Sequence, residues 1–202
     1  MLYQAFIKLL FVLNILILTA CGESSEPDSS NQELSQVGDD TVLVNVNITP
    51  VEGLDLTAKN YITTIGGKST VLSGGALSSE IEIDSTDLGT NSDTLVTTLA
   101  TEYGEPILIS YLSAADGSVE LSVETSADTF VMRNPVFYGV EITDLHILSE
   151  KIREHEQYPA LVKELIEQIV TSPCPMDFTC SMVAALIADD IANDIDFSDL
   201  VA

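Results

Sequence analysis

The segment TVLVNVNI, residues 41–48, decides the fold class because its apolar side chains recur at every second position. The three valines at even positions and Ile48 would share one face of an extended chain, since successive side chains of a strand point to opposite sides. The period of two therefore predicts a β-strand, and this strand begins the part of the chain that is expected to fold.

More strand-like segments follow as far as residue 132, separated by turns rich in glycine. Gly66-Gly67 and Gly74-Gly75 punctuate the early segments, and Ala114–Gly117 is expected to form a hairpin with the strand before it. A series of short strands with closely spaced turns predicts an antiparallel β-sandwich over residues 41–132. The strands predicted after the first are Tyr61–Ile65, Ser69–Leu72, Glu80–Asp84, Thr94–Ala100, Ile107–Leu112, Val119–Glu124 and Thr129–Met132.

Asn134-Pro135 ends the strand pattern, and residues 133–202 are predicted to form a small helical region, which makes the fold class α+β. The first long helix is expected to start near Thr143-Asp144, where a polar pair can act as the N-cap. The second follows Pro159, which suits the first turn of a helix. The third is expected over Ser181–Asn193.

Apolar stripes on these three helices are expected to belong to the core, because helices of this length are unstable alone. The helices are expected to pack on one another and, through Phe137 and Tyr138, against the sheet. The stripe residues are Leu145, Leu148 and Ile152, then Leu161, Val162, Leu165, Ile166, Ile169 and Val170, then Val183, Leu186, Ile187 and Ile191.

Residues 1–20 have the pattern of an export signal, with Lys8 ahead of an apolar run, Leu9–Leu18, that is shorter than the roughly 20 residues of a membrane span. Leu18-Thr19-Ala20-Cys21 resembles the lipobox of bacterial lipoproteins, in which a dedicated peptidase cuts just ahead of the cysteine. The resemblance implies that Cys21 becomes the first mature residue and carries the lipid. The alternative is an uncleaved N-terminal anchor helix.

The resemblance also implies a location, the bacterial cell envelope, with the protein attached to the membrane through its N-terminal lipid. Residue 22 is Gly rather than the Asp that retains such proteins at the inner membrane, which favours the outer membrane. Residues 21–40 are acidic and lack aromatic side chains, so they are predicted to form a disordered linker. As a flexible coil this linker spans on the order of 25 Å.

The chain has a formal net charge of −25, and removing residues 1–20 with Lys8 would leave −26. Such a surface repels nucleic acid and anionic lipid headgroups, so no nucleic-acid partner is expected. The expected partner is an unknown envelope protein or a surface polymer. The acidic surface also fits divalent counter-ions, although a merely solvated surface is the simpler interpretation.

Two cysteines remain after lipidation of Cys21, and they lie in the loop between the last two long helices. In an exported protein, Cys174 and Cys180 are expected to form a disulfide. A disulfide that closes a loop of about seven residues is expected to stabilise the fold by roughly 2.4 kcal/mol. The alternatives are a metal-binding pair or a redox pair, but redox pairs usually have two intervening residues.

Familiar catalytic motifs are not found. Gly67-Lys68-Ser69 lacks the earlier glycine of a phosphate-binding loop and lies between strands. His146 and His155 are nine residues apart, which places them on opposite sides of a helix and predicts two separate surface histidines.

Carboxylates cluster at two places, and both clusters are expected to be solvated faces, with calcium binding as the alternative. The first lies on one strand face and in the turn after it, and the second lies at the C-terminus. The cluster residues are Glu80, Glu82, Asp84 and Asp87, then Asp189, Asp190, Asp194, Asp196 and Asp199.

The segments Glu105–Tyr111 and Asp116–Ser122 make residues 41–132 resemble the small prealbumin-like or carboxypeptidase-regulatory-like modules of bacterial envelope proteins. With its helical region, the chain resembles uncharacterised envelope lipoproteins, a group that brings no catalytic residues. The resemblance implies a non-enzymatic binding or scaffolding module, and no catalytic, metal or cofactor site is predicted. The alternatives are a divalent-cation-dependent adhesin, a hydrolase accessory protein, or an enzyme of unfamiliar type.

Overall fold

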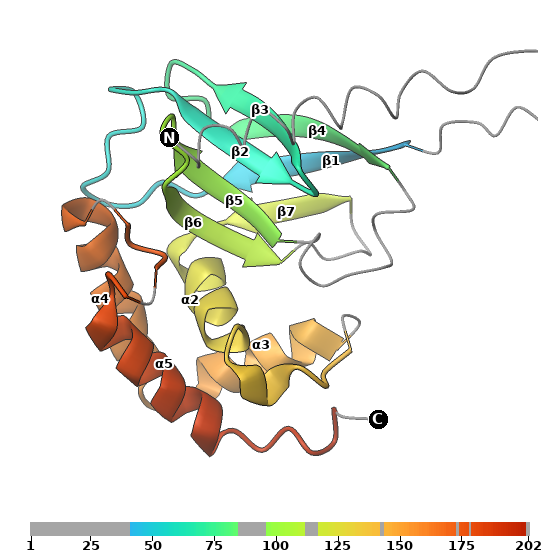
Figure 1. Ribbon diagram of the computed structural model, residues 1–202, viewed down its shortest axis with the longest axis vertical. Coiled ribbons are helices and arrows are strands. Elements are labelled where there is room, and N and C mark those ends of the chain that lie inside the picture. The colour runs from blue at the N-terminus through green and yellow to red at the C-terminus, as the bar shows by residue number, and fades with distance from the viewer. Residues whose placement is uncertain are drawn as a thin grey trace, which may run out of the picture. The chain divides into compact units, whose positions relative to one another are not determined.

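Strand β1, Thr41–Ile48, forms where the alternation predicts it, with Val44, Val46 and Ile48 buried between exposed neighbours. The computed structural model describes residues 41–84, 96–111, 117–141, 144–172, 174–177 and 179–200, all within one compact unit. Their architecture is α+β, with the described strands first and the described helices after them, as Figure 1 shows. The predicted signal segment, Cys21 and the linker lie outside the described residues.

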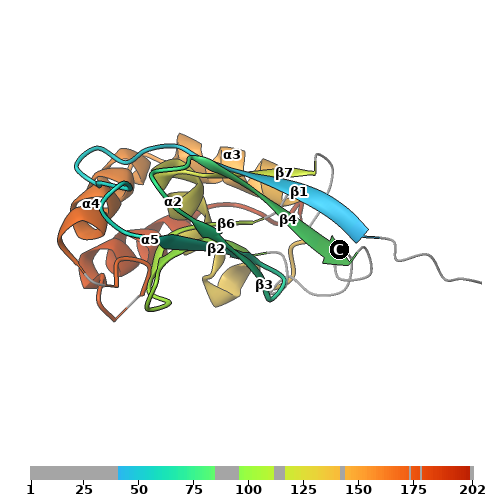
Figure 2. The same ribbon diagram turned by 90° about the horizontal axis from the view of Figure 1, so that it is seen from above.

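The described strands form two sheets, with strand orders β4-β1-β7 and β3-β2-β5-β6. Figure 2 shows the two layers from above. Apolar residues of both sheets belong to one core, which agrees with a sandwich. The strands after β1 are β2 (Tyr61–Ile65), β3 (Lys68–Leu72), β4 (Ser78–Asp84), β5 (Val96–Thr101), β6 (Pro106–Tyr111) and β7 (Ser118–Leu121).

One strand pairing differs from the prediction. Residues 114–117 were expected to join two neighbouring strands in a hairpin, but β7 does not pair with β6. It crosses to the other sheet and pairs with β1 in parallel, with Val46 beside Val119. The backbone N–H of Asn45 extends the ladder by donating to the Gly117 carbonyl at 2.9 Å. All other described pairs are antiparallel.

Helix α2, Val123–Met132, replaces the last predicted strand, Thr129–Met132, and shortens the one before it, Val119–Glu124. Its N-cap is Ser122, whose side chain accepts from the Thr125 N–H at 3.1 Å, while the Thr125 hydroxyl accepts from the Ser122 N–H at 2.9 Å. This reciprocal capping starts a helix in a segment that β-branched residues made look like strands.

The remaining described helices follow a short 3-10 turn, η3, at Pro135–Phe137. Pro159 lies in the first turn of its helix, as predicted. Thr143, half of the predicted cap pair, lies outside the described residues, and Asp144 is the N-cap. None of the helices in the described ranges is long and apolar enough to cross a membrane. The helices are α3 (Leu145–Glu154), α4 (Tyr158–Thr171) and α5 (Met182–Asp194).

The predicted apolar stripes are only partly buried. On α4, Leu161, Leu165 and Ile169 belong to the core, but Ile166 and Val170 are substantially exposed. On α5 the prediction was largely wrong, because only one of the four stripe residues, Ile191, is fully buried. Ala184, Ala188 and Ala192 form most of the buried face instead, since small side chains let a helix approach its neighbours closely.

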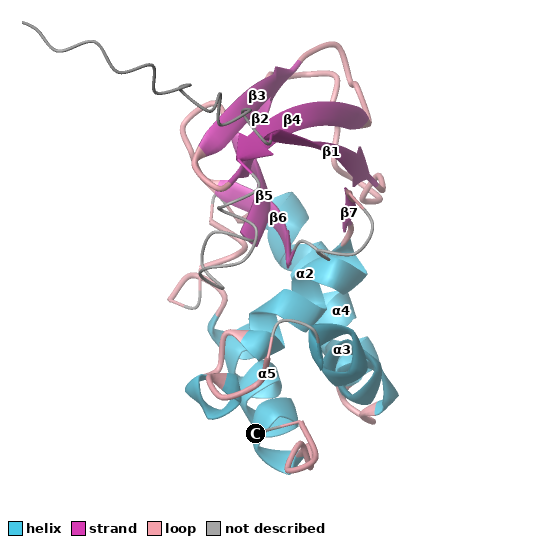
Figure 3. Cartoon of the chain, turned by 90° about the vertical axis from the view of Figure 1, so that its right-hand side faces the viewer, coloured by secondary structure: helices cyan, strands magenta, loops and turns pink. Residues whose placement is uncertain are grey.

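The helices join the sheet through α2 rather than through Phe137 and Tyr138. Phe137 is buried, but its ring packs edge-to-face on Phe197 with centroids 4.9 Å apart, and Tyr138 is 79% exposed. Figure 3 shows α2 between the strands and the other helices. Its Ser126 hydroxyl accepts from the Ile109 N–H of β6 at 3.0 Å.

Ser126 also lies 3.1 Å from the Ile109 carbonyl and 2.6 Å from the Ser122 carbonyl, and its single hydrogen is donated to one of them. An uncovered strand edge leaves N–H and C=O groups without partners. Helix α2 therefore covers this edge of β6 and connects it to the helical region.

Cys174 and Cys180 form a disulfide, as predicted, with their Cα atoms 6.0 Å apart. Inside the loop that they close, Met176 is buried. Ser181, directly before α5, donates through its side chain to the Pro175 carbonyl at 2.6 Å. The disulfide loop thus leads directly into the first turn of α5.

Removing this disulfide should destabilise the protein modestly. We expect the double variant Cys174→Ala with Cys180→Ala to lose roughly 2 kcal/mol, because a short loop restricts the unfolded chain little. This corresponds to a lower melting temperature by roughly 4 to 8 °C for a domain of this size. Differential scanning calorimetry measures the shift, and far-ultraviolet circular dichroism should keep its strand signal. An unchanged melting temperature after reduction of the wild-type protein would contradict the prediction.

Candidate functional site

The only charged side chain among the buried described residues is Asp128 of α2, which is 4% exposed. Its Oδ2 accepts from the Ser149 hydroxyl of α3 at 2.6 Å and from Arg153 Nε and Nη2 at 2.9 and 2.6 Å. Its Oδ1 accepts from the Tyr158 hydroxyl of α4 at 2.9 Å. A buried carboxylate of this kind is a candidate catalytic group.

The partners of Asp128 argue for a structural role. Both carboxylate oxygens already accept hydrogen bonds from the protein, so the group is not presented to a ligand. The hydrogen bond to Asp128 raises the pKa of Arg153, and burial followed by the charge of Asp128 raises the pKa of Tyr158. Arg153 is charged and Tyr158 is neutral at neutral pH even at their ordinary pKa values, and their hydrogen bonds to Asp128 hold α3 and α4 on α2.

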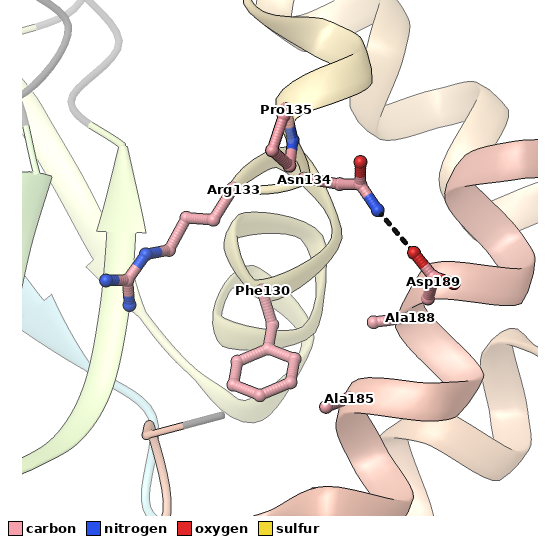
Figure 4. A pocket seen from close by; sticks show the side chains of 7 residues that line it. All are labelled: Phe130, Arg133, Asn134, Pro135, Ala185, Ala188 and Asp189. Atoms are coloured by element: carbon pink, nitrogen blue, oxygen red, sulfur yellow. Dashed lines mark hydrogen bonds between the residues drawn. The ribbon is translucent and has the colours of Figure 1, made fainter. Parts of the chain in front are cut away.

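A cleft lies on another side of α2, between its C-terminal end and α5, as Figure 4 shows. It has a volume of about 420 Å³. Phe130, Ala185 and Ala188 form an apolar wall, and Asn134 Nδ2 donates to Asp189 Oδ1 at 2.9 Å across one end. The lining residues are Phe130, Arg133, Asn134, Pro135, Ala185, Ala188 and Asp189.

An exposed apolar surface on α5, here called the α5 patch, consists of Met182, Val183 and Leu186, which are 67%, 53% and 62% exposed. Residues three and four apart are neighbours on a helix surface. Met182 and Asp189 therefore flank Ala185 along the helix, and Leu186 adjoins both of them. The α5 patch is continuous with the cleft through Ala185.

Neither predicted acidic cluster forms a cation site in the part of the chain that the structure describes, where no group of three His, Cys, Asp or Glu residues could hold a metal ion. Glu80, Glu82 and Asp84 do share the exposed face of β4, as expected, and the Thr41 hydroxyl donates to Glu82 at 2.6 Å. Asp87 lies outside the described residues.

The carboxylates near the C-terminus have separate partners instead of one centre. Asp194 lies 3.2 Å from His155, and Asp199 accepts from Lys151 at 2.8 Å. The N–H and hydroxyl of Ser198 lower the pKa of Asp196. Such local pairing is typical of a solvated surface.

The two histidines are separate, as predicted, but the prediction that both lie on the surface was wrong for His155. His146 is exposed on α3, whereas the side chain of His155, at the C-cap, is only 10% exposed and lies beside Asp194. Gly67 lies in the β2–β3 turn, where Gly66 and Gly67 adopt positive φ, and Lys68 and Ser69 begin β3, so the glycine-lysine-serine segment leads into no helix.

Raising the pH above the ordinary pKa of tyrosine, 10.0, should destabilise the fold through Tyr158. The unfolded chain then loses this proton while the folded chain keeps it, so stability is full below pH 10 and falls as the pH rises towards the folded pKa. Urea denaturation between pH 8 and pH 11 or so measures this dependence. In Tyr158→Phe, the free energy of unfolding should decline less steeply above pH 10. At neutral pH it should be lower than that of the wild type by about 1 to 3 kcal/mol, because Asp128 loses a hydrogen bond.

Tyr103→Phe is the matched control, because Tyr103 is 80% exposed. It should reproduce the wild-type curve. The structural role assigned to Tyr158 is contradicted if both variants decline as steeply as the wild type above pH 10.

No protein-family model matches the chain, and no curated protein or solved structure is significantly similar to it. No function is therefore carried over from a relative, and the α5 patch with its adjoining cleft is the candidate functional site.

Proposed function

We propose that the chain is a lipid-anchored envelope lipoprotein whose folded part is a non-enzymatic binding or scaffolding module, attached through Cys21 to the bacterial outer membrane. One observation carries the binding role, the exposure of the α5 patch. Large apolar side chains grouped on one surface are stabilised when a partner removes them from water. The side chains concerned are Met182, Val183 and Leu186.

Close packing on α2 explains why the buried face of α5 carries alanines, but it gives no reason for large apolar side chains on the exposed face. Helix α5 turns alanines towards the core and exposes larger side chains, although a larger side chain buries more apolar area. A binding role supplies a reason, because a partner could cover the exposed face without disturbing the buried one. The adjoining cleft between α2 and α5 offers room for an anchoring side chain of that partner.

The anchor is supported by the segment Leu18-Thr19-Ala20-Cys21. A single acyl chain gives only marginal membrane binding, and stable attachment needs two signals. A lipidated bacterial N-terminus carries two or three chains, which would hold the protein permanently. A linker over residues 21–40 would keep the module near the membrane while letting it turn towards a partner.

Replacing the lipidated cysteine tests the anchor. Cys21→Ser should leave the precursor unprocessed and unlabelled by a radioactive or clickable fatty acid, because the thioether cannot form. Cys174→Ser, in the disulfide loop, is the control and should be labelled like the wild type. Persistent labelling of Cys21→Ser would contradict the lipoprotein assignment.

Site-specific photo-crosslinking in intact cells tests the binding role. A photoreactive residue at Val183 in the α5 patch should give discrete adducts with another envelope component, because a partner covers this face. A probe at Val71 of β3, which is 63% exposed, should not give these adducts. The adducts should disappear when Leu186→Asp is added, because a carboxylate opposes burial of the patch.

The binding role fails if the probes at Val183 and Val71 give the same adducts, or if neither gives any. Thermal unfolding of Leu186→Asp provides the folding control. Since Leu186 is exposed, its melting temperature should stay close to that of the wild type.

A further inference from the structure

We infer that the α5 patch and the adjoining cleft bind a cationic amphipathic helix of another envelope protein, an inference that rests on the proposed binding role. The first half of α5 carries the exposed apolar residues Met182, Val183 and Leu186. The second half exposes Asp189 and Asp190. One helix therefore presents an apolar surface and an acidic surface in succession.

The shape of this surface favours an elongated partner. Met182, Leu186 and Asp189 follow one another at spacings of four and three, so they form a row along the helix axis. Beside this row, Ala185 and Ala188 have small side chains and leave the cleft open. An amphipathic helix docks in such a groove by anchors that repeat every three or four residues. One apolar anchor of the partner would enter the cleft beside Ala185 and Pro135, which are accessible there, whereas Phe130 is fully buried behind them.

The negative charge of this surface favours a positively charged partner. Asp190 is exposed in the last two turns of α5, and Asp194, the last residue of this helix, has a side chain that is 80% exposed. The carbonyl end of a helix adds partial negative charge at the same place. Arg133 is the cation that lines the cleft. Lysine or arginine side chains on the partner would find carboxylates beyond the apolar contact.

Other occupants fit this charge pattern less well. A second copy of the chain, with a net charge of −25, would bring the same carboxylates to the interface. A bilayer rich in anionic lipid would repel Asp189 and Asp190 as the α5 patch approached it. A helix with apolar and basic faces meets both halves of α5 with complementary groups.

Two dye-labelled helical peptides provide the test, with identical leucine positions and either lysine or glutamate at the polar positions. The full lipoprotein is held in phosphatidylcholine nanodiscs, and empty nanodiscs give the blank. Fluorescence anisotropy measures Kd. The lysine peptide should bind at least about tenfold more tightly than the glutamate peptide, with an affinity that falls as salt screens the charges.

Paired variants separate the two parts of the surface. Met182→Ser with Leu186→Ser should weaken binding of the lysine peptide by about tenfold or more, because central apolar contacts dominate such interfaces. Asp189→Asn with Asp190→Asn should weaken it by about threefold to tenfold and flatten its salt dependence. The amide that replaces the Asp189 carboxylate still offers an oxygen to accept from Asn134. Glu80→Gln with Glu82→Gln removes the same charge from β4 and should leave Kd unchanged.

Equal binding of both peptides, or an equal effect of the β4 variant and the α5 charge variant, would overturn the inference. If neither peptide binds while Val183 adducts to another protein persist in cells, the partner chemistry is wrong and the binding role survives. Adducts at Val183 to a second copy of the chain, or to lipid, would identify a different occupant and also overturn the inference. If the probe at Val183 gives no adduct at all, the proposed binding function itself is contradicted.

Discussion

The burial of the Asp128 carboxylate is the constraint on which the helical half depends. A charge taken out of water is tolerated only when opposite charge and hydrogen bonds replace its hydration. Here Arg153 donates twice, and Ser149 and Tyr158 donate once each. Because these donors come from α3 and from the start of α4, the carboxylate fixes both helices relative to α2. Apolar packing alone would leave their orientation less closely defined.

Helix α2 transmits this arrangement to the strands. On one side Ser126 pairs with the backbone of Ile109, so the helix takes the place of a further strand at the edge of β6. On other sides it buries Ala127, Phe130 and Val131. A helix that is buried on most sides cannot shift without disturbing both halves. The strands and the helices therefore depend on the same ten residues, Val123–Met132.

The sequence could predict those elements whose side chains follow one period. The alternation over residues 41–48 and the sequence of Tyr61–Ile65 led to strands with the observed bounds. Parts of the segment 123–132 were predicted as strands because Val123, Thr129 and Val131 favour strands, whereas in the structure Ser122 and Thr125 cap a helix. An intrinsic preference for strands is weak where tertiary contacts decide the conformation. The burial of Asp128, which requires donors from neighbouring helices, becomes visible only in the structure.

The candidate site escaped prediction for a related reason, since α5 is apolar on two faces and periodicity cannot say which face is buried. The larger face, with Val183 and Leu186, seemed the natural core. The structure turns the alanine face inward, because close approach to α2 requires small side chains. The disulfide loop then fixes the start of α5, because the Ser181 hydroxyl donates a hydrogen bond to the Pro175 carbonyl. Ser181 is the residue directly before the α5 patch begins. A patch held on such a rigid support loses little conformational entropy when a partner covers it, which favours recognition over chance exposure.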